Sequence, residues 1–223
     1  MNEKRNLTYG KIAIFVVILF MVWSLQRLYF RPVFINQLEG IQFELVDSGT
    51  KLLIWIFPTI WMLRRFKGEM WLDLKEMFTN KAPWLKILFF TVIIALVAYL
   101  VGTIYSDGFR MRTDFEPMIL IAPVLIAGIT EELVFRGFIL NSLLPKMKTP
   151  FAIAIDAILF ALIHYPIWIY AGFSLPTILL NSTFSMFFSV LLALSFLKTK
   201  NLLVPVGLHM FYNFLITMFV MGR

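Results

Sequence analysis

The sequence contains no cysteine, only two histidines and little charge. Because cysteine is absent, disulfide bonds, a thiolate zinc site and a cysteine nucleophile are all excluded. Charged residues make up 15% of the 223 residues and hydrophobic residues 60%, whereas soluble domains carry roughly 25% charged residues. Since about 20 apolar residues span a bilayer, the sequence predicts an all-α polytopic membrane protein with seven or eight transmembrane helices and no large soluble domain.

Seven apolar runs account for most of the chain. We expect the second run to start a few residues before Lys51. The segment 31–49, between the first two runs, is mixed in polarity, so we expect an external loop or a helix that lies in the membrane interface. The predicted spans are residues 10–29, 51–63, 87–105, 118–140, 151–170, 175–197 and 201–221.

Lysine and arginine are unevenly distributed over the predicted loops. Thirteen of the twenty lie on the side of the N-terminus, six lie on the opposite side, and Arg136 lies within a span. Cytoplasmic loops carry the excess of Lys and Arg, so we expect a multi-pass protein of the cell membrane with a cytoplasmic N-terminus. The net charge of +7 then serves orientation and contact with lipid headgroups, and we expect no nucleic-acid binding.

Ionisable and strongly polar side chains are rare within the predicted spans. Such groups cost several kcal/mol in a bilayer and usually mark a function or a partner within the bundle. Both histidines of the protein are among them. The set comprises Glu131, Glu132 and Arg136 in the fourth span, Asp156 and His164 in the fifth, and His209 and Asn213 in the seventh.

Residues four apart share a helix face, and two pairs in this set have that spacing. Glu132 and Arg136 can form an ion pair, which leaves Glu131, about 100° away around the helix, free to face another helix as a general base or acid. His209 and Asn213 present an imidazole and a carboxamide together. The spacing therefore predicts a carboxylate and an imidazole–carboxamide pair that face the inside of the bundle.

Phe160 and His164 repeat the same spacing, so we expect the phenyl ring to pack beside the imidazole and to help exclude water. At about 1.5 Å rise per residue, Glu131, His164, His209 and Asn213 fall at similar depths in the membrane. These side chains can therefore meet in one site.

Structural roles stay open for several of these residues. The Glu132–Arg136 pair can be a helix clamp without a part in chemistry, and a membrane histidine can be a satisfied interhelical hydrogen-bonding group. Asp156 lies eight residues before His164, about 80° around the helix. We expect it to serve helix packing or substrate access rather than chemistry.

Three short motifs lie in order on three predicted spans. Residues 131–136 read EExxxR, residues 160–164 read FxxxH and residues 209–213 read HxxxN. Together they resemble the signatures of the CAAX protease and bacteriocin-processing family, also called Abi, which includes the type II CAAX prenyl endopeptidase. The resemblance covers roughly residues 115–221. It implies a catalytic core of helices four to seven in residues 115–223, preceded by helices one to three in residues 1–114.

The resemblance implies an intramembrane endopeptidase whose active site opens toward the cytoplasm and the lipid. In such an enzyme Glu131 and His164 would activate the water that attacks the scissile carbonyl. His209 and Asn213 would stabilise the oxyanion.

The resemblance also implies supporting roles. Glu132 and Arg136 would hold the helix and position the first glutamate, and Phe160 would support the histidine. A metal is a second possibility, because two imidazoles and a carboxylate can bind zinc with one position open. We favour a metal-free mechanism without a cofactor, because an asparagine beside a histidine suits an oxyanion donor. The ligands of a zinc ion would be Glu131, His164 and His209.

The sequence contains none of the GxGD, GxSG and HExxH motifs of other intramembrane protease classes. Three substrate classes stay open: a prenylated CAAX protein, a bacteriocin or pheromone precursor, and a target in self-immunity or regulation. The short chain resembles bacterial members, which favours peptide maturation or bacteriocin self-immunity. Two other functions compete with proteolysis, a membrane scaffold that binds a partner protein and a proton-coupled transporter.

Overall fold

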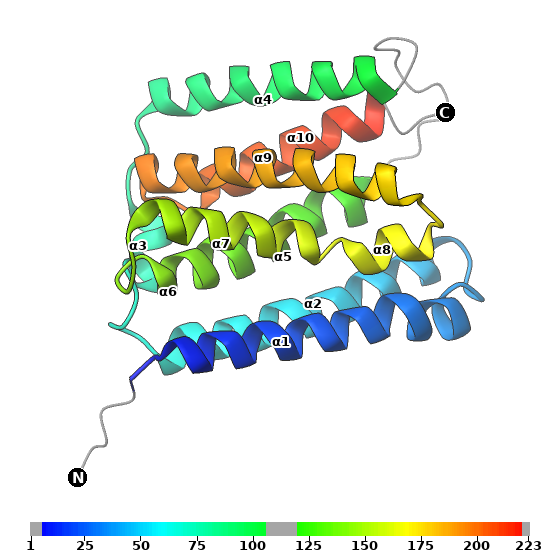
Figure 1. Cartoon of the computed structure of the whole chain (residues 1–223), viewed down its shortest axis with the longest axis horizontal. Helices are drawn as coiled ribbons and strands as arrows, with labels where there is room; N and C mark the ends of the chain where they lie inside the picture. Colours follow the sequence, from blue (N-terminus) through cyan, green and yellow to red (C-terminus); the bar gives the residue numbers. More distant parts are fainter. Residues whose placement is uncertain (1–5, 106–119, 220–223) are drawn as a thin grey trace.

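The computed structural model of the chain describes residues 6–105 and 120–219, and these residues form helices and loops without a strand. Long helices lie side by side, and consecutive long helices run in opposite directions (Figure 1). The elements are α1 (Tyr9–Leu25), continued by the π-helix η1 (Gln26–Ile35), α2 (Gly40–Arg65), α3 (Leu74–Thr79), α4 (Trp84–Tyr105), the continuous helix η3 (Ile121–Ile126), α5 (Ala127–Glu132), η4 (Leu133–Leu140) and α6 (Asn141–Leu143), then α7 (Thr149–Leu162), α8 (Tyr165–Tyr170), α9 (Leu175–Thr199) and α10 (Leu203–Phe219).

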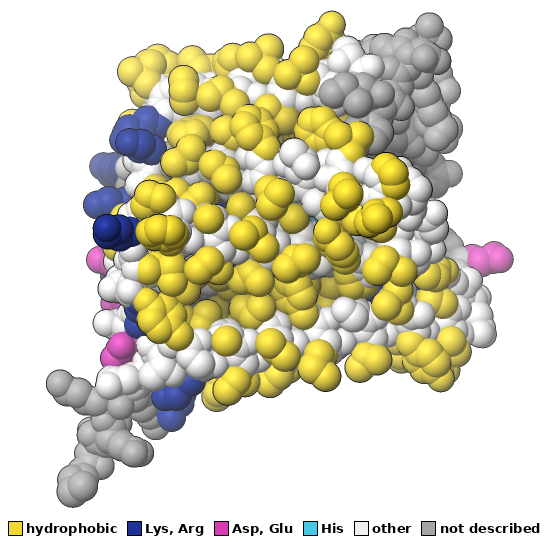
Figure 2. Space-filling view, viewed as in Figure 1, with side chains coloured by type: hydrophobic (Ala, Val, Ile, Leu, Met, Phe, Trp, Pro, Cys, Tyr) yellow, Lys and Arg dark blue, Asp and Glu magenta, His cyan; other side chains and the backbone are white. Residues whose placement is uncertain are grey.

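The outer surface of the helices is apolar. Figure 2 shows hydrophobic side chains over the middle of the bundle and Lys and Arg side chains gathered at one end. Four described helices are long and apolar enough to cross a membrane, and α10 is a shorter apolar helix. The chain is therefore a helical membrane protein, while the count of seven or eight spans stays a prediction. The four helices are Tyr9–Ile35, Trp84–Thr103, Thr149–Tyr170 and Leu175–Thr199.

The expectation of a loop or interfacial helix over residues 31–49 is wrong. Helix η1 continues α1 as far as Ile35, and α2 begins at Gly40. The physical reason is charge pairing, because Arg27 and Arg31 of η1 both contact the carboxylate of Asp47 in α2, at 3.1 and 3.2 Å. Arg31 and Asp47 of this segment therefore face one another between two packed helices.

The other predicted spans coincide with helices. The predicted start of the fourth span at Met118 and the predicted end of the seventh at Met221 lie outside the described residues. The fifth span is divided into α7 and α8 by a turn at Ile163 and His164. Pro166 accounts for this break, because a proline ring excludes a regular helical turn before it.

Two ends of the helix bundle differ in charge. We call the end formed by residues 66–73, 144–148 and 200–202 the basic end, and the end formed by residues 36–39 and 171–174 the opposite end (Figure 1). Three described basic residues, Arg27, Arg31 and Lys51, lie in the half of the bundle nearest the opposite end. Arg136 is buried in the core, and the others lie at the basic end: Lys11, Arg64, Arg65, Lys67, Lys75, Lys81, Lys86, Lys146, Lys148, Lys198 and Lys200.

The helix Ile121–Leu143 lies at the centre of the bundle, and every residue of its η4 segment is buried. Lipid is as apolar as these side chains, so close packing holds such a helix in place more than the hydrophobic effect does. Gly128 provides the closest approach to α10. A Cβ atom at this position would lie 2.6 Å from Cγ of Met210. The absence of a side chain at Gly128 therefore lets α5 and α10 come together.

We expect Gly128→Ala to separate α5 from α10 and to lower the melting temperature in detergent, because overpacking of a filled interface costs about 1–3 kcal/mol. Gly207→Ala is the matched control, since a Cβ atom on this α10 glycine meets no atom within 4 Å. Replacing that helical glycine should leave stability unchanged or slightly raised. Equal melting temperatures for the two variants would contradict the close approach.

Candidate active site

Glu131 lies in α5 and faces away from its own helix, as the sequence predicts. Its Oε1 accepts a hydrogen bond of 2.7 Å from Nζ of Lys51 in α2. Its Oε2 lies 3.7 Å from Nε2 of His164 and 3.9 Å from Nε2 of His209. Helices α2, α5, α7–α8 and α10 thus each contribute one polar side chain to a common point, and both histidines of the protein meet there.

Glu132 binds two cationic or imidazole groups at one oxygen atom. Its Oε1 accepts from Nη1 of Arg136 at 3.0 Å, which confirms the predicted ion pair, and lies 2.7 Å from Nδ1 of His209. Because Nδ1 is engaged, Nε2 is the nitrogen of His209 that faces Glu131. Glu132 therefore positions the α10 histidine directly, whereas the family resemblance assigns it the positioning of Glu131.

Arg136 is fully buried and joins two further helices to η4. Its Nη2 donates to the backbone carbonyl and to the hydroxyl of Ser189 in α9, at 2.8 and 2.7 Å. Its Nε lies 3.6 Å from Oδ2 of Asp156 in α7, and both side chains have no exposed surface. This position agrees with the packing role expected for Asp156, which is remote from the contacts of Glu131.

His164 lies in the turn between α7 and α8. The backbone carbonyl of Phe160 lies 2.7 Å from its Nδ1, which fixes the ring so that Nε2 points at Glu131. The ring stacks on Trp168 with a centroid distance of 5.5 Å, and the Phe160 ring packs beside it at 5.1 Å, as predicted. The proline-induced break of the helix therefore places an imidazole at the centre of the bundle with its outer nitrogen available.

A layer of aromatic rings closes the site on the side of the basic end. Each ring lies one helical turn nearer to that end than a polar residue of the site. Trp55 follows Lys51 in this way, Phe135 follows Glu131, and Phe160 lies next to His164 on the same side. The Phe135 ring lies 6.2 Å from Trp55 and 5.0 Å from Phe160 between ring centroids. All three aromatic side chains are at most 2% exposed. We call these three rings the aromatic floor, because they line the side of the site that faces the basic end.

Two cavities reach the histidines from the side away from the aromatic floor. One, of about 530 Å³, is lined by Lys51, Glu131, His164, His209 and Asn213 among others. A second, of about 260 Å³, shares the last three of these residues. Asn213 donates through Nδ2 to the carbonyl of Pro123 at 2.7 Å. The structure therefore brings the predicted catalytic residues to one cavity wall, while their catalytic roles stay a prediction.

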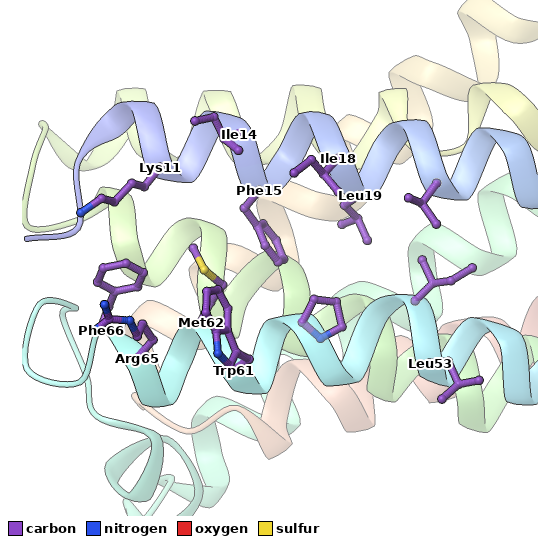
Figure 3. A pocket seen from close by; sticks show the side chains of 13 residues that line it. Lys11, Ile14, Phe15, Ile18, Leu19, Leu53, Trp61, Met62, Arg65 and Phe66 are labelled. Atoms are coloured by element: carbon purple, nitrogen blue, oxygen red, sulfur yellow. The ribbon is translucent and has the colours of Figure 1, made fainter. Parts of the chain in front are cut away.

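A third cavity lacks the side chains that hydrolysis requires. The groove between α1 and α2 has a volume of about 640 Å³ and is lined largely by apolar side chains such as Ile14, Phe15 and Trp61 (Figure 3). Lys11 and Arg65 lie at one end of it, and no carboxylate or imidazole is among its described lining residues. It therefore offers neither a general base nor an oxyanion donor.

Sequence reasoning missed Lys51, because it treated this residue as the outer boundary of a span. Lys51 is 8% exposed, and its ammonium lies over the rings of Trp23 and Trp55, at 5.6 and 5.0 Å from their centroids. The signal was present in the sequence, since Lys51 lies one turn after Asp47 and one turn before Trp55. A helix that begins well before Lys51 places that lysine inside the bundle, where the buried ammonium needs a carboxylate partner.

The donor set fits a zinc ion poorly. No group of three or more His, Asp or Glu side chains in residues 6–105 and 120–219 is arranged to hold a metal ion. The ammonium of Lys51 is already 2.7 Å from Glu131, and a divalent cation on the same carboxylate would be repelled by it. His209 also shares its Nδ1 with the Glu132–Arg136 pair. We therefore derive no step through a metal.

Comparison with known families identifies the second half of the chain. Residues 113–215 match the model of a family described as type II CAAX prenyl endopeptidase Rce1-like. This segment, slightly less than half of the chain, is similar to that family. No curated protein and no solved structure matches the chain.

The matched family is a family of proteases, and the apolar helices make the chain a membrane protein. The matched segment contains Glu131, His164, His209 and Asn213. Lys51 lies outside it, in the N-terminal part of the chain. The polar cluster is thus built from the matched segment together with one lysine from α2.

We expect Arg136→Met to destabilise the protein strongly, because removing one partner of a buried ion pair costs about 3–5 kcal/mol. Glu132 and Asp156 would be left facing each other without a cation. The melting temperature in detergent measures this loss, and Arg64→Met at the exposed end of α2 is the control. Equal melting temperatures for the Arg136 and Arg64 variants would contradict the stabilising role of the Arg136 side chain.

Proposed function

We propose that the protein is an intramembrane glutamate-dependent endopeptidase. The observation that supports this most is the position of the Glu131 carboxylate, which has Nε2 of both histidines at 3.7 and 3.9 Å and a cavity beside it. Both distances exceed a direct hydrogen bond. Gaps of this size between polar groups are commonly bridged by one water molecule. A bridging water would lie between a general base and two imidazoles.

In this mechanism Glu131 accepts a proton from the attacking water and later delivers it to the leaving amine. His164 holds the water through Nε2, because its Nδ1 is bound to the Phe160 carbonyl. Lys51 stabilises the negative charge of Glu131 and fixes one carboxylate oxygen, which leaves the other oxygen directed at the histidines. General base catalysis of this kind contributes typically 10²–10⁴-fold to the rate.

His209 and Asn213 are proposed as the oxyanion donors. The Glu132 carboxylate at Nδ1 of His209 compensates the positive charge that the ring carries when Nε2 donates to an oxyanion. Asn213 lines the same cavity and has a second N–H besides the one that donates to Pro123. Two donors directed at the developing charge are the arrangement that acyl transfer requires.

The mechanism is proposed to need no metal or other cofactor. Its support is the ammonium of Lys51 on Glu131 and the engagement of His209 with Glu132. Zinc held by Glu131, His164 and His209 is the alternative.

The proposed substrate is a membrane-associated peptide or a C-terminally lipidated protein of the CAAX type. In bacteria this activity suits peptide maturation or bacteriocin self-immunity. A non-proteolytic scaffold that binds a partner protein is the alternative. The complete set of polar residues around one cavity favours the protease, because a scaffold has no need to bury a carboxylate beside two imidazoles at the cost of several kcal/mol.

We further propose a multi-pass protein of the cell membrane with a cytoplasmic N-terminus. The alternation of helix direction (Figure 1) and the gathering of Lys and Arg at one end (Figure 2) support this orientation.

The mutations that test the proposal remove the base and the imidazole that holds the water. We expect purified Glu131→Gln and His164→Ala to cleave a fluorogenic peptide set at least about 10²-fold more slowly than wild type. Glu69→Gln, in the loop at the basic end, is the matched control and should retain full activity. The peptides carry prenylated and unprenylated C-termini, so the preferred class is read from the same assay.

Melting temperatures of all variants separate lost chemistry from lost folding. Wild-type rates in a correctly folded Glu131→Gln variant would contradict the glutamate mechanism. Absence of cleavage in wild type, together with a partner protein that co-purifies equally with wild type and variants, would favour the scaffold.

A further inference from the structure

The groove between α1 and α2 is open at the apolar outer surface of the bundle. Its floor is buried, since Phe15 and Leu19 are 8% and 3% exposed, and the Phe15 ring packs on Phe138 of η4 with a centroid distance of 4.6 Å. Its rims are exposed, with Ile18 at 56% and Trp61 at 60% (Figure 3). The groove is therefore a surface feature that the hydrocarbon chains of a membrane can enter.

The groove has the depth of one lipid leaflet. Its lining extends along α1 from Lys11 to Val22, which is about 16 Å at about 1.5 Å rise per residue. One leaflet is half of a hydrocarbon core that is about 30 Å thick. Trp23 follows Val22, and its ring contacts that of Trp55 in α2 at a centroid distance of 5.1 Å. The groove thus begins at the basic end and stops where the two helices come into ring contact, at the depth that one acyl chain reaches.

A neighbouring hollow of about 580 Å³ adjoins the groove. It shares Trp61 and Arg65 with the groove. Two apolar hollows that share one arginine match a lipid that carries two acyl chains on one phosphate-bearing headgroup. The other lining residues of the neighbouring hollow are Ile56, Phe57, Ile60 and Arg64.

Two cations at the basic end of the groove have no carboxylate partner. Nζ of Lys11 lies 5.3 Å from the centroid of the Phe66 ring, and Cζ of Arg65 lies 5.9 Å from it, so both cations lie around one ring (Figure 3). Within residues 6–105 and 120–219, the Lys11 ammonium donates to the backbone carbonyl of Asn6, and the Arg65 guanidinium makes no hydrogen bond or ion pair. The basic residues inside the bundle, in contrast, are each paired with a carboxylate.

We propose that the groove between α1 and α2 binds an anionic diacyl phospholipid of the surrounding membrane. One acyl chain lies in the groove, the second lies in the hollow on the other side of Trp61, and the phosphate contacts Lys11 and Arg65. Charge-assisted hydrogen bonds from guanidinium and ammonium groups to phosphate oxygens are strong. A zwitterionic lipid gains less, because its own ammonium neutralises the phosphate. The lipid site and the cavity beside Glu131 have no described lining residue in common.

Trp61 lines both hollows, so its fluorescence reports what occupies them. The full-length protein is reconstituted into phosphatidylcholine vesicles that contain a small fraction of lipid with brominated acyl chains, either phosphatidylglycerol or phosphatidylcholine. Bromine quenches a tryptophan that it contacts. Each protein is compared with the same protein carrying Trp61→Phe, and the difference separates the quenching of Trp61 from that of the other tryptophans.

We expect phosphatidylglycerol to be preferred over phosphatidylcholine at Trp61 by at least about tenfold. Lys11→Gln and Arg65→Gln should each lower this preference about fivefold, which corresponds to about 1 kcal/mol for each basic residue near the membrane surface. Lys11→Arg keeps the charge and should keep the preference. Lys198→Gln should keep it as well, because Lys198 is an exposed lysine at the same end that lines neither hollow.

Equal quenching of Trp61 by the two brominated lipids would overturn the proposal, because the groove would then hold ordinary boundary lipid. A preference that survives in both glutamine variants, or that falls as far in Lys198→Gln, would overturn it too, since general surface charge would be its cause. Quenching by neither lipid would show that a second copy or a partner helix covers the groove. Melting temperatures verify the folding of each variant. The assay needs no cleavage, so its result is independent of the proposed function.

Discussion

A charge inside an apolar bundle has to be neutralised by a partner from another element, and this constraint organises the whole site. Lys51 with Glu131 joins α2 to α5, and Arg136 joins η4 to α7 and α9 through Asp156 and Ser189. The Glu132 carboxylate adds α10 through His209. Each partner has an opposite charge or a hydrogen-bonding group within reach, so no helix can shift without leaving a buried ion unpaired.

The same pairs fix the direction of the reactive atoms. One oxygen of Glu131 is bound to Lys51, and the other therefore faces the two imidazoles. Each imidazole has its Nδ1 engaged, by the Phe160 carbonyl in one case and by Glu132 in the other. Preorganised groups of this kind contribute to catalysis because they need no rearrangement when charge develops. The interactions that hold the helices together thus also hold the reacting groups in place.

The spacing of residues along the predicted helices predicted much of the candidate site. The spacing of Glu132 and Arg136 indicated their ion pair, and that of Phe160 and His164 indicated the packed ring, because both depend only on 3.6 residues per turn. The partner of His209 could not be predicted this way, since it depends on which residue of α5 faces α10. Lys51 and the Arg27–Asp47 pair were missed for the same reason. A polarity scale places Arg27 and Lys51 near the ends of spans and Asp47 in a connecting segment, whereas the packed helices neutralise their charges.

The chemical role of Glu131 is the central claim, and metal content measured on an active preparation tests it most directly. The metal bound to the purified wild-type protein is quantified while its peptide cleavage is followed with and without a zinc chelator. The account predicts cleavage that survives complete chelation in a protein that contains far less than one metal ion per chain. Bound zinc in a full complement, with activity that is lost on chelation and restored by zinc alone, would contradict it.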